Sequence, residues 1–190
     1  MMSSAQPSPT SRPWSPPIPP IIIMGVQGCG KTTIGELLAK RLGVPVVDGD
    51  SLHSRANKEW MTSGHALSDE QRLPWLHEVG GRLALGERSG VVVACSALKR
   101  SYRDLLRVHA PTMLTVFARG DIDLIHDRIT ARQHEYMPPS LLATQFDDLE
   151  EREPDEPGVT VDIEETPRQI VERVIALITE EGAAHDHQQS

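Results

Sequence analysis

From Ile21 to Thr33 the sequence reads IIIMGVQGCGKTT. An apolar run of the kind found in buried strands leads into a glycine-rich loop, and an amphipathic pattern with Ile34, Leu37, Leu38 and Leu42 on one face follows. The spacing matches G-x-x-x-x-G-K-[ST], a loop that binds phosphate groups when it joins a strand to a helix. This stretch therefore predicts a strand, a phosphate-binding loop and a helix that form one nucleotide site.

Each part of the loop has a physical role in that prediction. Glycines tolerate positive φ, which turns backbone N–H groups inward toward phosphate oxygens, and the following helix directs its positive end to the same place. We expect Lys31 to reach the β- and γ-phosphates as a catalytic charge and Thr32 to bind Mg²⁺. The residues expected to contact ATP are Gly25, Gln27, Gly28, Cys29, Gly30, Lys31, Thr32 and Thr33.

Composition narrows the class of protein. The 190 residues carry a net charge of −8, which argues against nucleic-acid binding, because that function needs a basic face. The two cysteines suit reduced thiols better than a disulfide framework. The sequence has no apolar segment of about 18 residues that would suggest a membrane span. We therefore expect a soluble, cytoplasmic protein that does not associate with membranes.

The apolar runs predict the fold class. Most are apolar at consecutive positions, as in parallel strands covered on both faces, and helical patterns lie between them. We expect an α/β fold: a three-layer α/β/α sandwich with a five-stranded parallel sheet. Together with the phosphate loop this arrangement resembles P-loop NTPases of the nucleoside-monophosphate-kinase-like type, and the resemblance implies a mobile lid. The expected strands are 21–24, 44–47, 91–94, 113–118 and 159–163.

The predicted organisation is one domain with two extensions. Residues 1–19 are rich in proline and predict a disordered arm, 20–181 form the domain, and 182–190 are expected to be a flexible tail. Two connections are longer than a crossover between parallel strands requires. We expect the first, at about 51–88, to hold the substrate and the second, at about 132–146, to be a lid that contains a helix after Met137-Pro138-Pro139.

Two carboxylates follow the second predicted strand. Asp48 and Asp50 flank Gly49, and alternation along an extended chain would place both side chains on one side. We expect Asp48 to hold Mg²⁺ and Asp50 to accept a proton from an attacking hydroxyl group. A polar turn after a strand is the alternative.

Basic residues near the strand ends are candidates for binding an anionic substrate, although solvated surface charge is the usual role of each one alone. Lys99 and Arg103 are four residues apart and would share one helix face. The candidate substrate-binding residues are Asp50, His53, Arg55, Lys58, Arg72, Lys99 and Arg103. Trp60 and Trp75 are expected to pack in the core or at a hinge.

Arg128 and Arg132 are also four residues apart, at the entrance to the predicted lid. Arginine can stack on a base or clamp phosphates, so both are candidate nucleotide ligands, and Arg132 is also a candidate catalytic residue. The alternative is surface ion pairing with Asp127 or Asp121.

Beyond the phosphate loop, the chain resembles the gluconate kinase family over about residues 20–178. The resemblance implies ATP-dependent, Mg²⁺-requiring phosphorylation of D-gluconate at its 6-hydroxyl, with Asp50 as the base. It also implies that the protein acts on a small molecule and forms a homodimer. The segments that carry it are DGDSLH at 48–53, RLPWL at 72–76, CSALK at 95–99, VDI at 161–163, and the stretch 131–146 with its Met-Pro, Leu-Leu and Gln-Phe pairs.

Two other functions remain open at this point. A related kinase could use another acceptor such as shikimate, because Asp48-Gly49-Asp50 suits those enzymes too. A nucleotide-dependent switch or adaptor could instead use the proline-rich arm for docking. The Asp pair and the basic residues favour a kinase over a switch, because a switch has no use for an acceptor pocket.

Overall fold

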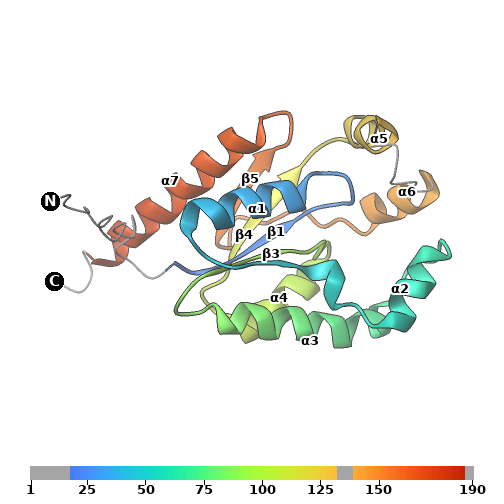
Figure 1. Cartoon of the computed structure of the whole chain (residues 1–190), viewed down its shortest axis with the longest axis horizontal. Coiled ribbons are helices and arrows are strands. Elements are labelled where there is room, and N and C mark those ends of the chain that lie inside the picture. The colour runs from blue at the N-terminus through green and yellow to red at the C-terminus, as the bar shows by residue number, and fades with distance from the viewer. Residues whose placement is uncertain (1–17, 132–138, 187–190) are drawn as a thin grey trace, which may run out of the picture.

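The computed structural model describes residues 18–131 and 139–186 of the protein (Figure 1). Within these residues a parallel sheet has the strand order β2-β3-β1-β4-β5. This confirms the predicted five-stranded parallel sheet. Its strands are β1 (Pro20–Met24), β2 (Val46–Asp48), β3 (Val91–Ala94), β4 (Leu114–Arg119) and β5 (Gly158–Asp162).

Helices cover both faces of the sheet, which gives the predicted three layers. In Figure 1, α1 and α7 lie on one face and α3 and α4 on the other, while α2, α5 and α6 lie at one end of the molecule. No helix in the described ranges is long and apolar enough to span a membrane. The helices are α1 (Lys31–Leu42), the 3₁₀ helix η1 (Gly49–Leu52), α2 (Arg55–Thr62), α3 (Asp69–Leu85), α4 (Arg100–His109), α5 (Ile122–Ala131), α6 (Pro139–Asp147) and α7 (Pro167–Asp186).

The core forms on both faces of β1, whose residues are all buried. Ile21 and Ile23 pack in one apolar cluster with residues of α1 and α7, whereas Ile22 and Met24 pack in another with residues of α3 and α4. Successive side chains of a strand point to opposite faces, so a consecutive apolar run serves both layers. The carboxyl ends of the parallel strands consequently meet at one edge, where ligands bind in open α/β sheets.

Local sequence signals set two helix boundaries that matter for the site. Helix α1 ends at Gly43, whose φ of 69° is the left-handed cap conformation expected there. Helix α3 begins with a capping box, in which the Ser68 and Gln71 side chains each accept a hydrogen bond from the other's backbone N–H.

The predicted arm, lid and tail are described only in part. Ile18, which falls within the expected arm, packs against the apolar core. Helix α7 continues to Asp186, so the expected tail at 182–190 begins inside a helix. Residues 139–147 form α6, which confirms a helix after Pro138-Pro139. Residues 1–17, 132–138 and 187–190 lie outside the described ranges.

Candidate active site

The phosphate loop has the backbone geometry that the motif predicts. Gly25, Gly28 and Gly30 adopt φ values of 146°, 83° and 95°. A Cβ at Gly28 would lie 2.6 Å from Cγ1 of Ile129, so glycine is required there by space as well as by conformation. No described residue accepts a hydrogen bond from the amide of Gly28 or Gly30. These amides are therefore available to a phosphate group.

The start of α1 is suited to an anion. Its N-cap is Gly30, which provides no capping side chain, and its first turn contains no acidic residue. Thr32 and Thr33 are exposed at this end. The Lys31 Nζ donates to the carbonyl of Val26 at 2.9 Å, so the lysine folds back over the loop.

Cys29 differs from the other loop residues. Its side chain is buried in the apolar core, and its thiol is free. Only the backbone of Cys29 can therefore contact a nucleotide.

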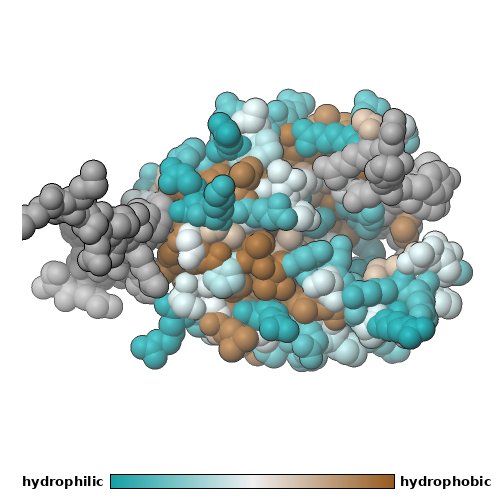
Figure 2. Space-filling model, viewed as in Figure 1, coloured by the Kyte–Doolittle hydropathy of each residue, from teal (hydrophilic) through white to brown (hydrophobic). Residues whose placement is uncertain are grey.

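A cleft of about 630 Å³ opens beside the loop. Both long connections supply its walls: α2 and the turn after it form one side and α6 the other, and the surface is hollowed between these two helices (Figures 1 and 2). The polar residues that line it include Gln27, Lys31, Asp50, His53, Lys58, Arg72, Ser96, Gln145 and Asp148.

Asp48 and Asp50 have different places in the structure. The chain turns into η1 at Gly49, so the two carboxylates are not related by strand alternation, and that expectation was wrong. Instead Asp48 Oδ1 accepts a hydrogen bond from the Asp50 N–H at 3.0 Å, and only Asp50 lines the cleft. Burial raises the pKa of Asp50; the Lys31 charge opposes this rise and the Asp48 charge adds to it.

The donor atoms near the loop suit Mg²⁺. The Thr32 hydroxyl and the Asp48 carboxylate are hard oxygen ligands, and Mg²⁺ is commonly held by one or two such groups together with substrate phosphates. Among the described residues no group of three or more His, Cys, Asp or Glu side chains forms a self-contained metal site. Thr32, exposed at the start of α1, and Asp48, at the end of β2, are thus of the chemical type that holds Mg²⁺.

His53 is held in the cleft wall by Trp75. Their rings stack with centroids 4.2 Å apart, and the Trp75 Nε1 donates to the carbonyl of Gly49 at 2.7 Å. Burial, together with the positive charges of Arg72 and Lys58, lowers the pKa of His53 to about 4. The ring is thus neutral at pH 7, and its buried Nδ1 has no partner among the described residues. Trp75 packs in the core as expected, but its role in placing His53 had no signal in the sequence.

Two of the predicted basic residues face the cleft with hydrogen-bonding capacity to spare. The Lys58 Nζ donates to the carbonyl of Ser51 at 2.7 Å, and the Arg72 Nε donates to that of Leu67 at 3.2 Å. For Arg72 this bond orients the guanidinium group and leaves its two terminal nitrogens for an anion.

Arg55 and Lys99 do not line the cleft. The Arg55 side chain is 93 % exposed and pairs with Glu59 at 2.7 Å. The Lys99 ammonium lies 2.9 Å from Asp69 and 3.6 Å from Asp148, so two carboxylates already compensate its charge. Asp148 itself lines the cleft, which places Lys99 one residue behind the wall.

The expectation for Arg103 was wrong. Its side chain is completely buried and forms a bidentate pair with Glu156, at 2.7 and 2.9 Å. It also donates to the carbonyls of Ala97 and Leu98, next to the positive φ of 39° at Ala97. Lys99 is the N-cap of α4, and Arg103 faces inward one turn later, so the two do not converge on one anion. Arg103 instead stabilises the turn between β3 and α4.

Arg128 lies on α5 and donates to the carbonyl of Ile163, after β5, at 2.6 Å. It forms no ion pair with Asp127, and Asp121 caps the backbone N–H of Leu124 instead. The alternative of surface ion pairing is therefore not seen for Arg128 among the described residues, and its nucleotide role stays a prediction. Arg132 lies outside the described ranges.

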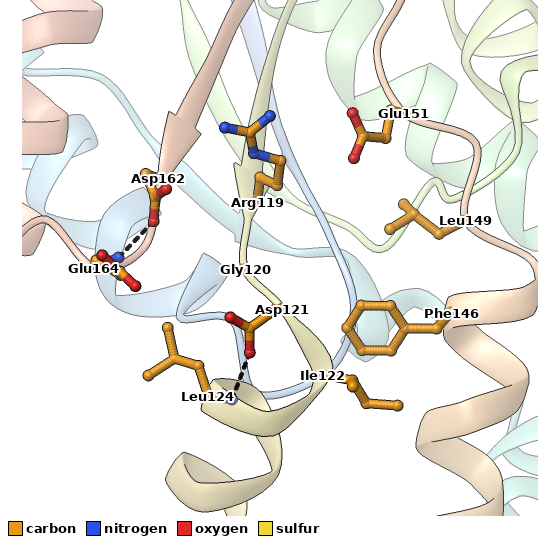
Figure 3. A pocket seen from close by; sticks show the side chains of 10 residues that line it. All are labelled: Arg119, Gly120, Asp121, Ile122, Leu124, Phe146, Leu149, Glu151, Asp162 and Glu164. Carbon is orange, nitrogen blue, oxygen red and sulfur yellow. Dashed lines mark hydrogen bonds between the residues drawn. The ribbon is translucent and has the colours of Figure 1, made fainter.

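A second cleft, of about 640 Å³, lies at the ends of β4 and β5 (Figure 3). Arg119 is its only basic lining residue among those described, against four carboxylates, and this balance disfavours a triphosphate. Two of the carboxylates cap nearby backbone N–H groups. The four acidic residues are Asp121, Glu151, Asp162 and Glu164.

Comparisons with known proteins agree with this arrangement. A family model described as shikimate kinase matches residues 27–179. Solved shikimate kinases resemble the chain in fold alone, at 17 to 18 % identity and TM-scores of 0.55 and 0.59. Together with the loop and the cleft, these matches define the class: the protein is a P-loop kinase.

More similar relatives narrow the class. The thermoresistant gluconokinase of Escherichia coli K12 is 38 % identical over 160 residues, which cover 83 % of this chain and 91 % of that one. The gluconokinase of Gluconobacter oxydans is 40 % identical over 157 residues, covering 82 % and 88 %. A solved gluconokinase from Sinorhizobium meliloti covers 90 % of this chain and 98 % of its own, at 39 % identity and a TM-score of 0.83. The chain belongs to the gluconokinase family.

Proposed function

We propose that the protein transfers the terminal phosphoryl group of ATP to the 6-hydroxyl of D-gluconate, giving 6-phospho-D-gluconate and ADP. The observation that supports this proposal is a single cleft whose lining includes Lys31 of the phosphate loop, Asp50 and Arg72. The gluconokinase relatives support the identity of the acceptor.

The nucleotide would bind with its phosphates in the loop. The amides of Gly28 and Gly30 and the start of α1 would hold them, and Lys31 would leave the Val26 carbonyl to neutralise their charge. Thr32 and Asp48 would hold Mg²⁺, which supplies further charge neutralisation when bound. Arg128, beside the carbonyl of Ile163, would contact the adenine, and Arg132 the transferring group.

The acceptor would bind between Asp50 and the basic wall. Arg72 and Lys58 would take the gluconate carboxylate, and neutral His53 would hydrogen-bond a hydroxyl group. Asp50 would orient the 6-hydroxyl and accept its proton, a task helped by its raised pKa. Most of the catalysis would then come from positioning and charge neutralisation.

We extend the proposal in three respects. Closure of the segment 132–146 over the cleft would exclude water, which would otherwise take the phosphoryl group. The enzyme would act in the cytoplasm, where Cys29 and Cys95 remain free thiols as they are in the structure. It would form a homodimer.

The test is ADP release from ATP and Mg²⁺ with D-gluconate, other sugar acids, shikimate and AMP, against a blank without acceptor. We expect turnover on gluconate to exceed that on every other acceptor by about a hundredfold, which corresponds to about 2.7 kcal/mol in the transition state. Gluconate turnover at the blank rate, with ATP still bound, would reject this acceptor. Faster turnover on shikimate would support the alternative named by the family model.

A further inference from the structure

A hydrogen bond joins the two walls of the cleft across a long stretch of sequence. The side-chain carbonyl oxygen of Gln145, on α6, accepts from the backbone N–H of Gln27, in the phosphate loop, at 2.7 Å. The residues are 118 positions apart in the chain. The Gln27 N–H, a phosphate-loop amide that could donate to a phosphate oxygen, therefore donates to the uncharged side-chain oxygen of Gln145 in this structure.

The position of this bond indicates which phosphate it concerns. Gln27 and Gln145 line the cleft together with Lys31 and Asp50. A phosphoryl group that moves from the loop to a hydroxyl at Asp50 moves within this cleft, which Gln27 and Gln145 line. The Gln27 amide is therefore placed to bind an oxygen of the terminal phosphoryl group.

Gln145 can exchange its role by turning its own side chain. Leu142, one turn earlier on α6, is buried in the apolar core, so this part of the helix already lies against the phosphate-loop side of the domain. The terminal amide of glutamine carries both an acceptor oxygen and a donor NH₂ group, and rotation of that amide is soft. The same side chain can accept from the Gln27 amide and, after rotation, donate to a phosphate oxygen.

Lys31 is also bonded within the loop, because its ammonium group donates to the Val26 carbonyl. Asp148, also on the cleft wall, lies 3.6 Å from Lys99, which it shares with Asp69, so its charge is partly compensated. Lys31, Lys58 and Arg72 line the same cleft and supply the positive charge that a phosphate needs.

We infer that Gln145 is a positioning residue for the terminal phosphoryl group. In this structure its carbonyl oxygen accepts from the Gln27 amide. When ATP binds, a terminal phosphate oxygen takes that amide, and the NH₂ group of Gln145 turns to donate to the same phosphoryl group. ADP lacks this group and leaves the contact in place. The inference rests on the proposed kinase function but not on gluconate as the acceptor.

The experiment measures nucleotide affinity by calorimetry, with Mg²⁺ and without acceptor, for ADP and the non-hydrolysable analogue AMPPNP. Gln145→Glu keeps an oxygen that accepts from Gln27 but repels a phosphate. We expect AMPPNP to bind about tenfold or more weakly to this variant while ADP affinity changes less than about threefold. Equal losses for both nucleotides, or none, would overturn the inference.

Gln71→Glu is the matched control, because Gln71 also accepts a backbone N–H, that of Ser68, and lies outside the cleft lining. We expect it to bind both nucleotides as the unmodified protein does. A change of affinity in this control equal to that in Gln145→Glu would count against a local role for Gln145.

A measurement on the unmodified protein covers the case in which a variant fails to fold. The ¹⁵N amide resonance of Gln27 should shift with AMPPNP and stay near its free position with ADP. An identical shift with both nucleotides would overturn the inference. Because no step uses an acceptor, failure of gluconate turnover would reject the proposed acceptor and leave this result intact.

Discussion

The ring of His53 stacks on the indole of Trp75 with 13° between their planes. Through its Nε1 the same indole holds the carbonyl of Gly49, in the turn that carries Asp50. One core residue thus fixes both the neutral imidazole and the expected base. Its position on α3, in the long connection between β2 and β3, links the packing of that connection to the chemistry of the cleft.

Trp75→Phe tests this link. The ring face remains, but the buried Gly49 carbonyl loses its donor, so we expect the free energy of unfolding to fall by about 1–3 kcal/mol. Turnover should fall as well, because Asp50 is held less firmly. Chemical denaturation and coupled ADP release measure the two effects. Trp60→Phe removes a similar bond at an exposed site and should cost less than about 0.5 kcal/mol. Equal stability of the two variants would contradict the expectation.

His53 predicts a pH dependence of stability. Its folded pKa, about 4, lies below the 6.5 of a free histidine side chain, so the unfolded chain takes up the proton first as pH falls. Its contribution to stability is therefore fully present above about pH 6.5 and is lost toward pH 4. Between pH 7 and 5 the loss should be about 2 kcal/mol. His53→Phe should remove this part of the pH dependence, whereas the same change at exposed His126 should retain it. Identical pH profiles of the unmodified protein and His53→Phe, measured by urea unfolding, would refute the assignment.

Lys31→Met tests the phosphate loop. Because the lysine would neutralise charge on the transferring group, we expect kcat to fall by about a hundredfold or more, equivalent to about 2.7 kcal/mol. Lys40→Met changes an exposed lysine of the same helix and should leave kcat unchanged. Full turnover by Lys31→Met would remove the central role given to this residue.

A comparison of variants at Arg72 and Arg55 tests whether gluconate is bound by the basic residues that face the cleft and not by those outside it. Arg72→Gln should raise the KM for gluconate about tenfold or more, because one charge-assisted contact is lost, and change the KM for ATP little. Arg55→Gln alters an exposed arginine paired with Glu59 and should change neither. Steady-state kinetics with each substrate varied in turn would measure this, and equal effects of the two changes would contradict it.

Arg103→Met should act on stability. Removal of the guanidinium leaves buried Glu156 without its bidentate partner and with Arg107 at 3.9 Å as the remaining cation in the described residues, which should cost about 3–5 kcal/mol. Arg103→Met combined with Glu156→Leu should recover part of that loss, because the uncompensated charge is gone. The part of the stability loss that is not recovered comes from the carbonyls of Ala97 and Leu98, which no longer receive a hydrogen bond from Arg103. A cycle of single and double variants in urea measures the coupling. A stable single variant with a raised KM for gluconate would restore the role expected from the sequence.

Most of the fold could be predicted from local patterns. The run at Ile21–Met24 is apolar on both faces, and the loop after it contains glycine where φ must be positive, so a buried strand and a phosphate loop followed directly. The candidate site was predicted less completely. Arg72 and Lys99 are both basic residues near strand ends, and no local feature distinguishes the one in the cleft from the one paired with Asp69.

The sequence by itself determined the layered fold, the phosphate loop, the position of Asp50 and, through its resemblance, the family. These depend on neighbouring residues or on motif spacing. Only the tertiary structure decided that Arg103 is a buried partner of Glu156, that Trp75 places His53, and that Gln145 meets Gln27. Each of these contacts joins separate elements of the chain, and a side chain's partner depends on how those elements pack.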